Sequence, residues 1–129
     1  SNQFNTTIKN CNISMGSDGN ANALGIEMTD AADNSNVVNN TIVGEMYYGI
    51  SFASGNNGPE NSLIENNFVN VSAFNSTGVG IATTGIYLYT SSNNTLTSNT
   101  GTSYSDHGIY LRTSSNNILD RIRKVDVEK

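Results

Sequence analysis

The stretch GIYLYTSSNN at residues 85–94 returns 23 residues later as GIYLRTSSNN at residues 108–117, and the only change places Arg112 where the first copy has Tyr89. Weaker copies of this Gly-Ile motif stand at residues 24–29 and 48–53. Repeats of a few dozen residues are typical of solenoids, because one repeat cannot bury its apolar face alone and stacks on its neighbours. The repetition therefore predicts a stacked architecture.

A second motif follows each Gly-Ile motif and also opens the chain. Its copies occupy residues 5–13, 34–42, 60–68, 93–101 and 116–124. The order and spacing of the two motifs are kept, and the insertions fall between the second motif and the next Gly-Ile motif. The unit is thus a coil of about two dozen residues, on the scale of known repeat families.

Apolar and polar residues alternate within each motif, which predicts half-buried strands. In GIYLY, Ile86 and Leu88 point to one side, and Tyr87 and Tyr89 point to the other. Aligning the copies predicts four inward columns: Ile26, Ile50, Ile86 and Ile109; Met28, Phe52, Leu88 and Leu111; Ile8, Val37, Leu63, Leu96 and Leu119; and Ile13, Ile42 and Phe68.

Asparagine also recurs in register, and the chain contains 22 asparagines. An Asn in a turn can bond to its own backbone and to its equivalents in adjacent coils. The alignment predicts two such ladders, which we assign to the scaffold: Cys11, Asn40, Asn66 and Asn99; and Asn61, Asn94 and Asn117.

The segments GIYLYTSSNNTLTSNT and GIYLRTSSNNILD resemble the right-handed parallel β-helix repeats of the pectate-lyase-like superfamily. They are most similar to the NosD-like carbohydrate-binding and sugar-hydrolysis group, whose repeats read roughly GIYLxxSSNNxIxxNxI, and the resemblance covers residues 5–122. It implies three short parallel strands per coil. The superfamily includes polysaccharide lyases, hydrolases, epimerases, periplasmic proteins linked to copper-enzyme maturation and non-catalytic cell-surface modules. The repeat motif itself is structural and carries over no catalytic residues.

We therefore expect an all-β fold, a right-handed parallel β-helix of about five coils, in one domain spanning residues 1–129. The chain starts at Ser1, so we expect either a processed protein or a piece of a longer one. Five of the six basic residues lie in the last 18 positions, and residues 121–129 are predicted to form a charged tail or cap.

Composition excludes several classes of function. The net charge of −5 would repel a phosphate backbone, so we expect no nucleic-acid partner. No apolar run approaches the length of a membrane helix, so we expect no membrane span. One cysteine allows no internal disulfide, and no Cys/His cluster has zinc spacing.

All six tyrosines lie on or beside the outward face of the Gly-Ile strands. Aromatic rings with polar tips suit stacking on sugar rings or on a protein partner. The alternative is that outward tyrosines pair with one another along the sheet, as aromatic residues in strands commonly do. The residues predicted to bind a ligand are Tyr48, Tyr87, Tyr89, Tyr104, Tyr110 and Arg112.

The sequence offers only a sparse acid–base group, made of Asp106, His107 and Arg112. Glu27 and Asp106 are predicted to lie three coils apart, about 14 Å, which exceeds the separation of glycosidase carboxyl pairs. Asp30 and Asp33 could supply oxygens to calcium, although acidic residues in such a segment more often form a turn. His, Met and Cys are scattered, which argues against copper. We expect no metal and no cofactor.

These observations favour an extracellular or cell-surface module, with the periplasm as an alternative. Its expected role is non-catalytic, structural or glycan-contacting, with a polysaccharide or cell-surface glycan as partner. Two alternatives remain open: a fragment of a polysaccharide lyase or hydrolase, and a fibre subunit that self-associates end to end. In a glycosylating cell, Asn70 and Asn75 are the predicted glycan acceptors among the Asn-x-Ser/Thr sequences.

Overall fold

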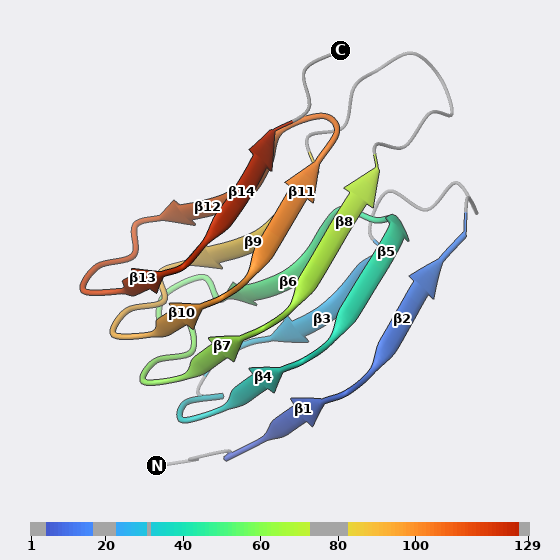
Figure 1. The fold of residues 1–129 in the computed structure, drawn as a ribbon. Helices are drawn as coiled ribbons and strands as arrows, with labels where there is room; N and C mark the ends of the chain where they lie inside the picture. Colours follow the sequence, from blue (N-terminus) through green and yellow to red (C-terminus); the bar gives the residue numbers. More distant parts are fainter. Residues whose placement is uncertain (1–4, 17–22, 31, 73–82, 127–129) are drawn as a thin grey trace.

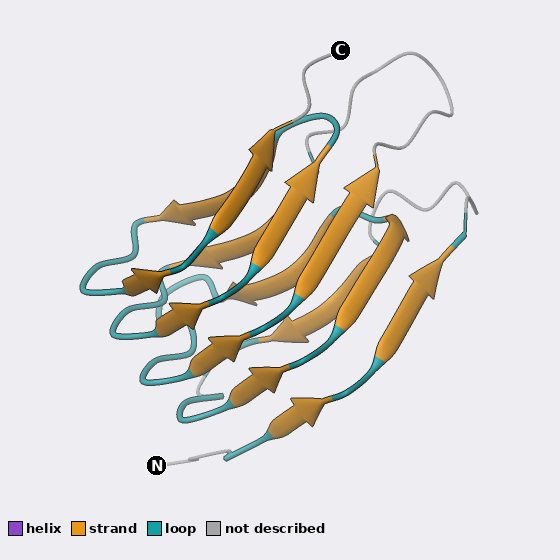
Figure 2. Ribbon diagram, viewed as in Figure 1, coloured by secondary structure: helices purple, strands orange, loops and turns teal. Residues whose placement is uncertain are grey.

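Short strands joined by tight turns make up the computed structural model, which describes residues 5–16, 23–30, 32–72 and 83–126. These ranges contain no helix, and the strands pair in parallel (Figures 1 and 2). The high content of Asn, Ser and Thr suits this arrangement, because these residues favour turns over helix interiors.

The strands form three parallel sheets, and each sheet takes one strand from each coil. The first sheet contains β1 (Thr7–Lys9), β4 (Asn36–Val38), β7 (Leu63–Glu65), β10 (Thr95–Thr97) and β13 (Ile118–Asp120). The second contains β2 (Asn12–Met15), β5 (Thr41–Glu45), β8 (Phe68–Ser72), β11 (Thr100–Ser103) and β14 (Arg123–Asp126). The third contains β3 (Leu24–Met28), β6 (Tyr48–Ala53), β9 (Thr84–Tyr89) and β12 (His107–Arg112).

The chain visits the three sheets in turn, so β1, β2 and β3 make one coil of a solenoid. Four coils are complete, and β13 and β14 begin a fifth. In Figure 1 the chain runs in front through the first two sheets and returns behind through the third, and the successive coils advance in a right-handed sense. The predicted parallel β-helix with three strands per coil is confirmed.

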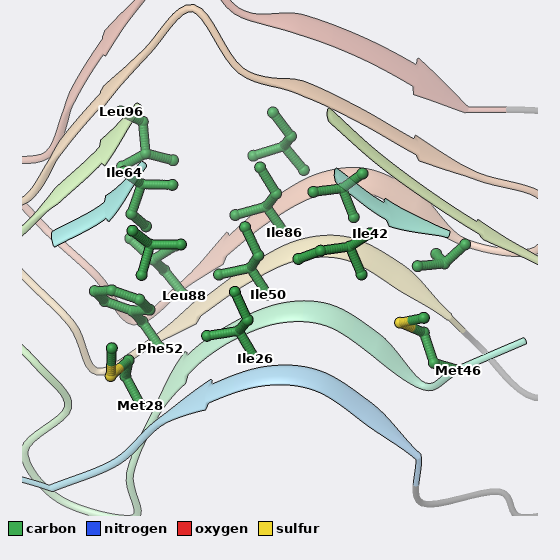
Figure 3. Packing of buried hydrophobic residues seen from close by; sticks show 14 of the residues in the cluster. Ile26, Met28, Ile42, Met46, Ile50, Phe52, Ile64, Ile86, Leu88 and Leu96 are labelled. Carbon is green, nitrogen blue, oxygen red and sulfur yellow. The ribbon is translucent and has the colours of Figure 1, made fainter. Parts of the chain in front are cut away.

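The inward columns predicted for the Gly-Ile strands are present in the third sheet. Ile26, Ile50 and Ile86 lie opposite one another, and Phe52 packs between Met28 and Leu88 (Figure 3). Full burial of such a side chain is worth about 1.5–3 kcal/mol relative to exposure. Stacked coils share this core, which no single coil could bury.

The predicted register of residues 60–68 is wrong by one position. Val37 pairs with Ile64 rather than Leu63, and Ile42 pairs with Val69 rather than Phe68. Phe68 instead points outward and is 46% exposed. Both Leu63 and Ile64 are aliphatic, so the alternation of residue types does not decide which faces inward, and a one-residue slip moves every side chain to the other face.

The same correction changes the asparagine ladders. One ladder runs through Asn40, Asn67 and Asn99, in which the backbone N–H and side-chain amide of Asn67 both donate to Asn99 Oδ1 at 3.0 Å. In the other ladder, Ser62, not Asn61, lies next to Asn94: its N–H donates to Asn94 Oδ1 at 2.9 Å. These bonds satisfy buried turn groups that would otherwise lack partners.

Asn61 and Asn66 serve a different purpose, because both have left-handed backbone conformations, with φ of 53° and 52°. Their equivalents in the preceding coil, Asn34 and Asn39, also have left-handed backbone conformations. Asparagine tolerates this conformation better than most residues with a side chain. In the Asn-Asn pairs that precede the second-sheet strands, the first residue therefore turns the chain, and the second extends the ladder.

The glycine of each Gly-Ile motif lies where the third sheet approaches the second. A Cβ atom on Gly25 would lie 2.7 Å from Ile42 Cγ2, and one on Gly49 would lie even closer to Val69 Cγ1, both on second-sheet strands. No side chain fits into this space, which explains why the motif begins with glycine.

Part of the predicted charged tail belongs to the solenoid. Arg123–Asp126 form β14, which pairs with β11 in the second sheet, while residues 127–129 lie outside the described ranges. Lys124 lies opposite Gly101, in the column that Ile13, Ile42 and Val69 occupy in other coils. None of the described residues forms a long apolar helix of the kind that crosses a membrane.

Candidate functional site

An aromatic strip crosses the outer face of the third sheet. We define it as Tyr47, Tyr48, Tyr87, Tyr89, Tyr110 and His107, with Arg112 at one end. The register places Tyr87 opposite Tyr110 and Tyr89 opposite Arg112, as predicted. The alternation of the strand directs Ile86 and Leu88 into the core and leaves Tyr87 and Tyr89 on the other face.

Ring contacts connect the strip from β6 across β9 to β12. Tyr48 stacks on Tyr87, with centroids 4.5 Å apart and planes 20° apart, and Tyr47 lies 4.3 Å from Tyr48. Tyr87 in turn lies 5.7 Å from Tyr110 and 6.2 Å from Tyr89. Aromatic pairs at such distances stabilise by about 0.5–1.5 kcal/mol beyond the area that they bury. The strip is thus ordered before any ligand binds.

Tyr87 is at the centre of the strip and is covered by the rings around it. Only 7% of Tyr87 is exposed, whereas Tyr89 and Tyr110 are partly exposed and Tyr104 is 39% exposed. The prediction of an exposed row of rings is therefore wrong for Tyr87. The expected alternative, in which tyrosines pair along the sheet, describes the contact between Tyr87 and its neighbours.

Burial also changes the acidity of two phenols. Loss of solvent raises the pKa of Tyr87 above its usual value, and a hydrogen bond with Arg112 opposes that rise. Burial raises the pKa of Tyr48 more strongly, and its hydrogen bond with Tyr47 adds to the effect. A phenol is protonated at neutral pH even at its ordinary pKa near 10, so the raised values extend the pH range over which both groups can donate hydrogen bonds.

Arg112 ends the strip at the last residue of β12. Its guanidinium carbon lies 5.4 Å from the centroid of the Tyr89 ring, a distance typical of a cation–π contact. The side chain is exposed, so the guanidinium can also reach a ligand. The single change between the two motif copies thus places a cation where a fourth outward ring would stand, and this cation stacks on the ring of Tyr89.

Asp106 and His107 lie at the opposite end of β12. His107 stacks on Tyr110 with centroids 4.7 Å apart, and its Nδ1 contacts Asp106 Oδ1. Asp106 is held by its own backbone, whose N–H donates to Ser103 Oγ at 3.2 Å. The structure thus brings Asp106 and His107 together, as predicted, and separates them from Arg112 by the length of β12.

Asp30 and Asp33 both bond to the loop of the next coil. Asp30 Oδ1 accepts a hydrogen bond from Ser54 at 2.9 Å, and Asp33 Oδ1 accepts one from the Glu60 N–H at 2.8 Å. These contacts fit the turn role that the sequence favoured. In the described part of the chain, no three His, Cys, Asp or Glu side chains cluster as metal ligands would.

The described residues include only one of the two predicted glycan acceptors. Asn70 lies within β8, its side-chain oxygen is buried, and no described group bonds to that oxygen. A side chain in this setting is a poor acceptor for a bulky glycan, which needs an exposed site. Asn75 lies outside the described residues.

Tyr47 is the one strip residue that none of the site predictions included, since His107 was predicted as part of the acid–base group. It precedes β6 and contacts Tyr48 by its ring, although adjacent residues in a regular strand would point to opposite faces. Tyr47 lies just before the first residue of β6, so the regular alternation of side chains does not apply to it. The doubled tyrosine before Gly49 was the available signal.

No protein-family model matches this chain, and comparison with curated proteins and with solved structures gave no match either. The β-solenoid is therefore established by the structure alone. The resemblance to the pectate-lyase-like superfamily, and to its NosD-like group, stays a prediction.

Proposed function

We propose that this β-solenoid is a non-catalytic extracellular or cell-surface module that contacts glycans through the aromatic strip. The observation that carries the proposal is the continuous run of ring contacts from Tyr48 through Tyr87 to Tyr110 and His107. Sugar rings present flat apolar faces and hydroxyls together, and tyrosines offer complementary apolar bodies and polar tips.

The partly exposed members of the strip are proposed to make the contacts. Tyr89, Tyr110 and the exposed Arg112 surround the covered ring of Tyr87. Tyr87 therefore supports the surface by packing, and its neighbours present edges and hydrogen-bonding groups to the ligand. Because the rings already pack against one another, binding need not order them, which lowers the entropic cost of association.

Glycan-array binding tests this proposal, followed by titration of the best oligosaccharide. Tyr110→Ala and Arg112→Ala should each weaken binding at least tenfold, while Phe68→Ala, an exposed ring on the second sheet, should leave it unchanged. Equal affinities for wild type, Tyr110→Ala and Arg112→Ala would show that the strip is not the binding surface. Circular dichroism controls for loss of fold.

A second candidate is a polysaccharide lyase or hydrolase, and the contact between Asp106 and His107 favours it. A carboxylate beside an imidazole is a common acid–base arrangement. The register leaves Glu27 three strands from Tyr110, about 14 Å at the usual strand spacing, so Glu27 is not a paired carboxyl for that end of β12. Release of unsaturated or reducing sugar, abolished by His107→Ala, would support the enzyme over the binding module.

The fibre hypothesis meets an obstacle at β14. A second copy stacked on this strand would cover Lys124, whose register places it in an inward column, and moving a charged group out of water carries a desolvation cost. Inward charges on edge strands are a known protection against such pairing. Sedimentation at rising concentration tests this point, and growth of long assemblies would restore the fibre hypothesis.

A further inference from the structure

The two ring nitrogens of His107 lie in different surroundings. Nδ1 is buried and contacts Asp106 Oδ1, and it has no hydrogen bond of good geometry with the described residues. The side chain as a whole is 42% exposed. Because Nδ1 is buried while the side chain is 42% exposed, we take Nε2, on the far side of the ring, to be the nitrogen that faces solvent.

A carboxylate can only accept hydrogen bonds, so the atom against it must carry the proton. An unprotonated Nδ1 would place its lone pair against the negative charge of Asp106. Neighbouring groups restrain both side chains. The Tyr110 ring fixes the imidazole plane, while Ser103 Oγ accepts the Asp106 N–H and itself donates to Thr83 O at 2.6 Å.

We infer that Asp106 holds His107 in the Nδ1–H tautomer, so that the strip presents unprotonated Nε2 as a hydrogen-bond acceptor beside Tyr110. This deepens the proposed function and rests on it for the identity of the ligand. An acceptor next to a carboxylate suits the hydroxyl of a neutral sugar and disfavours a carboxylate or sulfate. Arg112, at the other end of β12, only donates.

Long-range ¹H–¹⁵N NMR of the imidazole gives a direct test, and the chain has one histidine, so assignment is unambiguous. At neutral pH the wild type should show mainly the Nδ1–H tautomer. Asp106→Ala and the size-matched Asp106→Asn should shift the population toward Nε2–H, while Asp120→Ala, an exposed acid on β13, should not. A wild type that is mainly Nε2–H, or equal populations in wild type and Asp106→Ala, overturns the inference.

Binding then tests what the acceptor does. Wild type should bind a neutral oligosaccharide severalfold more tightly than Asp106→Ala does, and more tightly than it binds the matching uronate. Equal affinity of both proteins for the neutral sugar overturns the acceptor role. If the wild type binds no glycan at all, the proposed function fails, and the tautomer measurement decides the inference by itself.

Discussion

Residues 85–94 and 108–117 have nearly the same sequence, yet they lie in different surroundings. The first copy stands between two coils, and Leu88 and Asn94 are fully buried there. Their equivalents in the second copy, Leu111 and Asn117, are only partly buried. The repeat motif therefore specifies the conformation of the chain, while the number of neighbouring coils decides how much each residue contributes to stability.

The first-sheet strands that follow the two copies show the same contrast. Leu96 on β10 is fully buried, whereas Leu119, paired with it on β13, is 46% exposed. Leu119 continues the core column that contains Leu96, but in this structure no coil lies beyond β13 to cover the Leu119 side chain. Identical motifs should accordingly respond differently to identical substitutions.

The largest expected difference is between Leu88→Ala and Leu111→Ala. Removing a fully buried leucine leaves a cavity and should cost about 3–5 kcal/mol, whereas the partly buried equivalent should cost roughly half as much. Urea unfolding of both variants measures the two free energies. Equal losses would mean that the motif, and not its place in the stack, sets the energy.

The ladder residues should show a smaller difference in the same direction. Asn94 accepts a hydrogen bond from the Ser62 N–H and donates to Pro59 O, and both bonds are buried. Asn94→Ala leaves buried partners unsatisfied and should cost about 2–3 kcal/mol, against about 1 kcal/mol for Asn117→Ala. Thermal unfolding should rank the two variants in this order, and the reverse order would contradict the ladder assignment.

Alkaline pH should distinguish the tyrosines. Burial raises the pKa of Tyr87, so the folded protein keeps a proton that the unfolded chain loses near pH 10. The stability that this phenol contributes is complete below about pH 10 and is lost as the pH rises through the raised folded-state value. Tyr87→Phe should reduce the alkaline loss of stability, and Tyr104→Phe, at an exposed position, serves as the control. Parallel pH curves for wild type and Tyr87→Phe would contradict the burial of this phenol.

The smallest effect is expected from Arg112→Tyr, which makes the two copies identical. It removes the cation–π contact with Tyr89, worth about 0.5–1 kcal/mol at an exposed site, and replaces it with a ring pair of similar energy. The free energy of unfolding should change by less than about 1 kcal/mol, while glycan affinity should fall. Unchanged affinity would remove Arg112 from the site.

Much of this arrangement could be predicted from the sequence, because alternation and repetition both report on backbone geometry. The columns through Ile86 and Leu88 and the pairing of Tyr87 with Tyr110 follow from the GIYL motif. The register at Leu63 could not be decided, since two aliphatic neighbours fit the inward position equally well. The burial of Tyr87 could not be predicted from the sequence either, because it depends on Tyr48. That residue lies on another coil and reaches Tyr87 diagonally.

Hydrogen exchange with and without the best glycan ligand tests most directly whether function resides at the outward positions where the copies differ. We expect ligand-induced protection to concentrate on β12, around His107, Tyr110 and Arg112, with a weaker effect on Tyr89 of β9. The first and second sheets should show no change. Protection centred on the outer face of β7 and β10, or none on β12 at saturating ligand, would contradict this expectation.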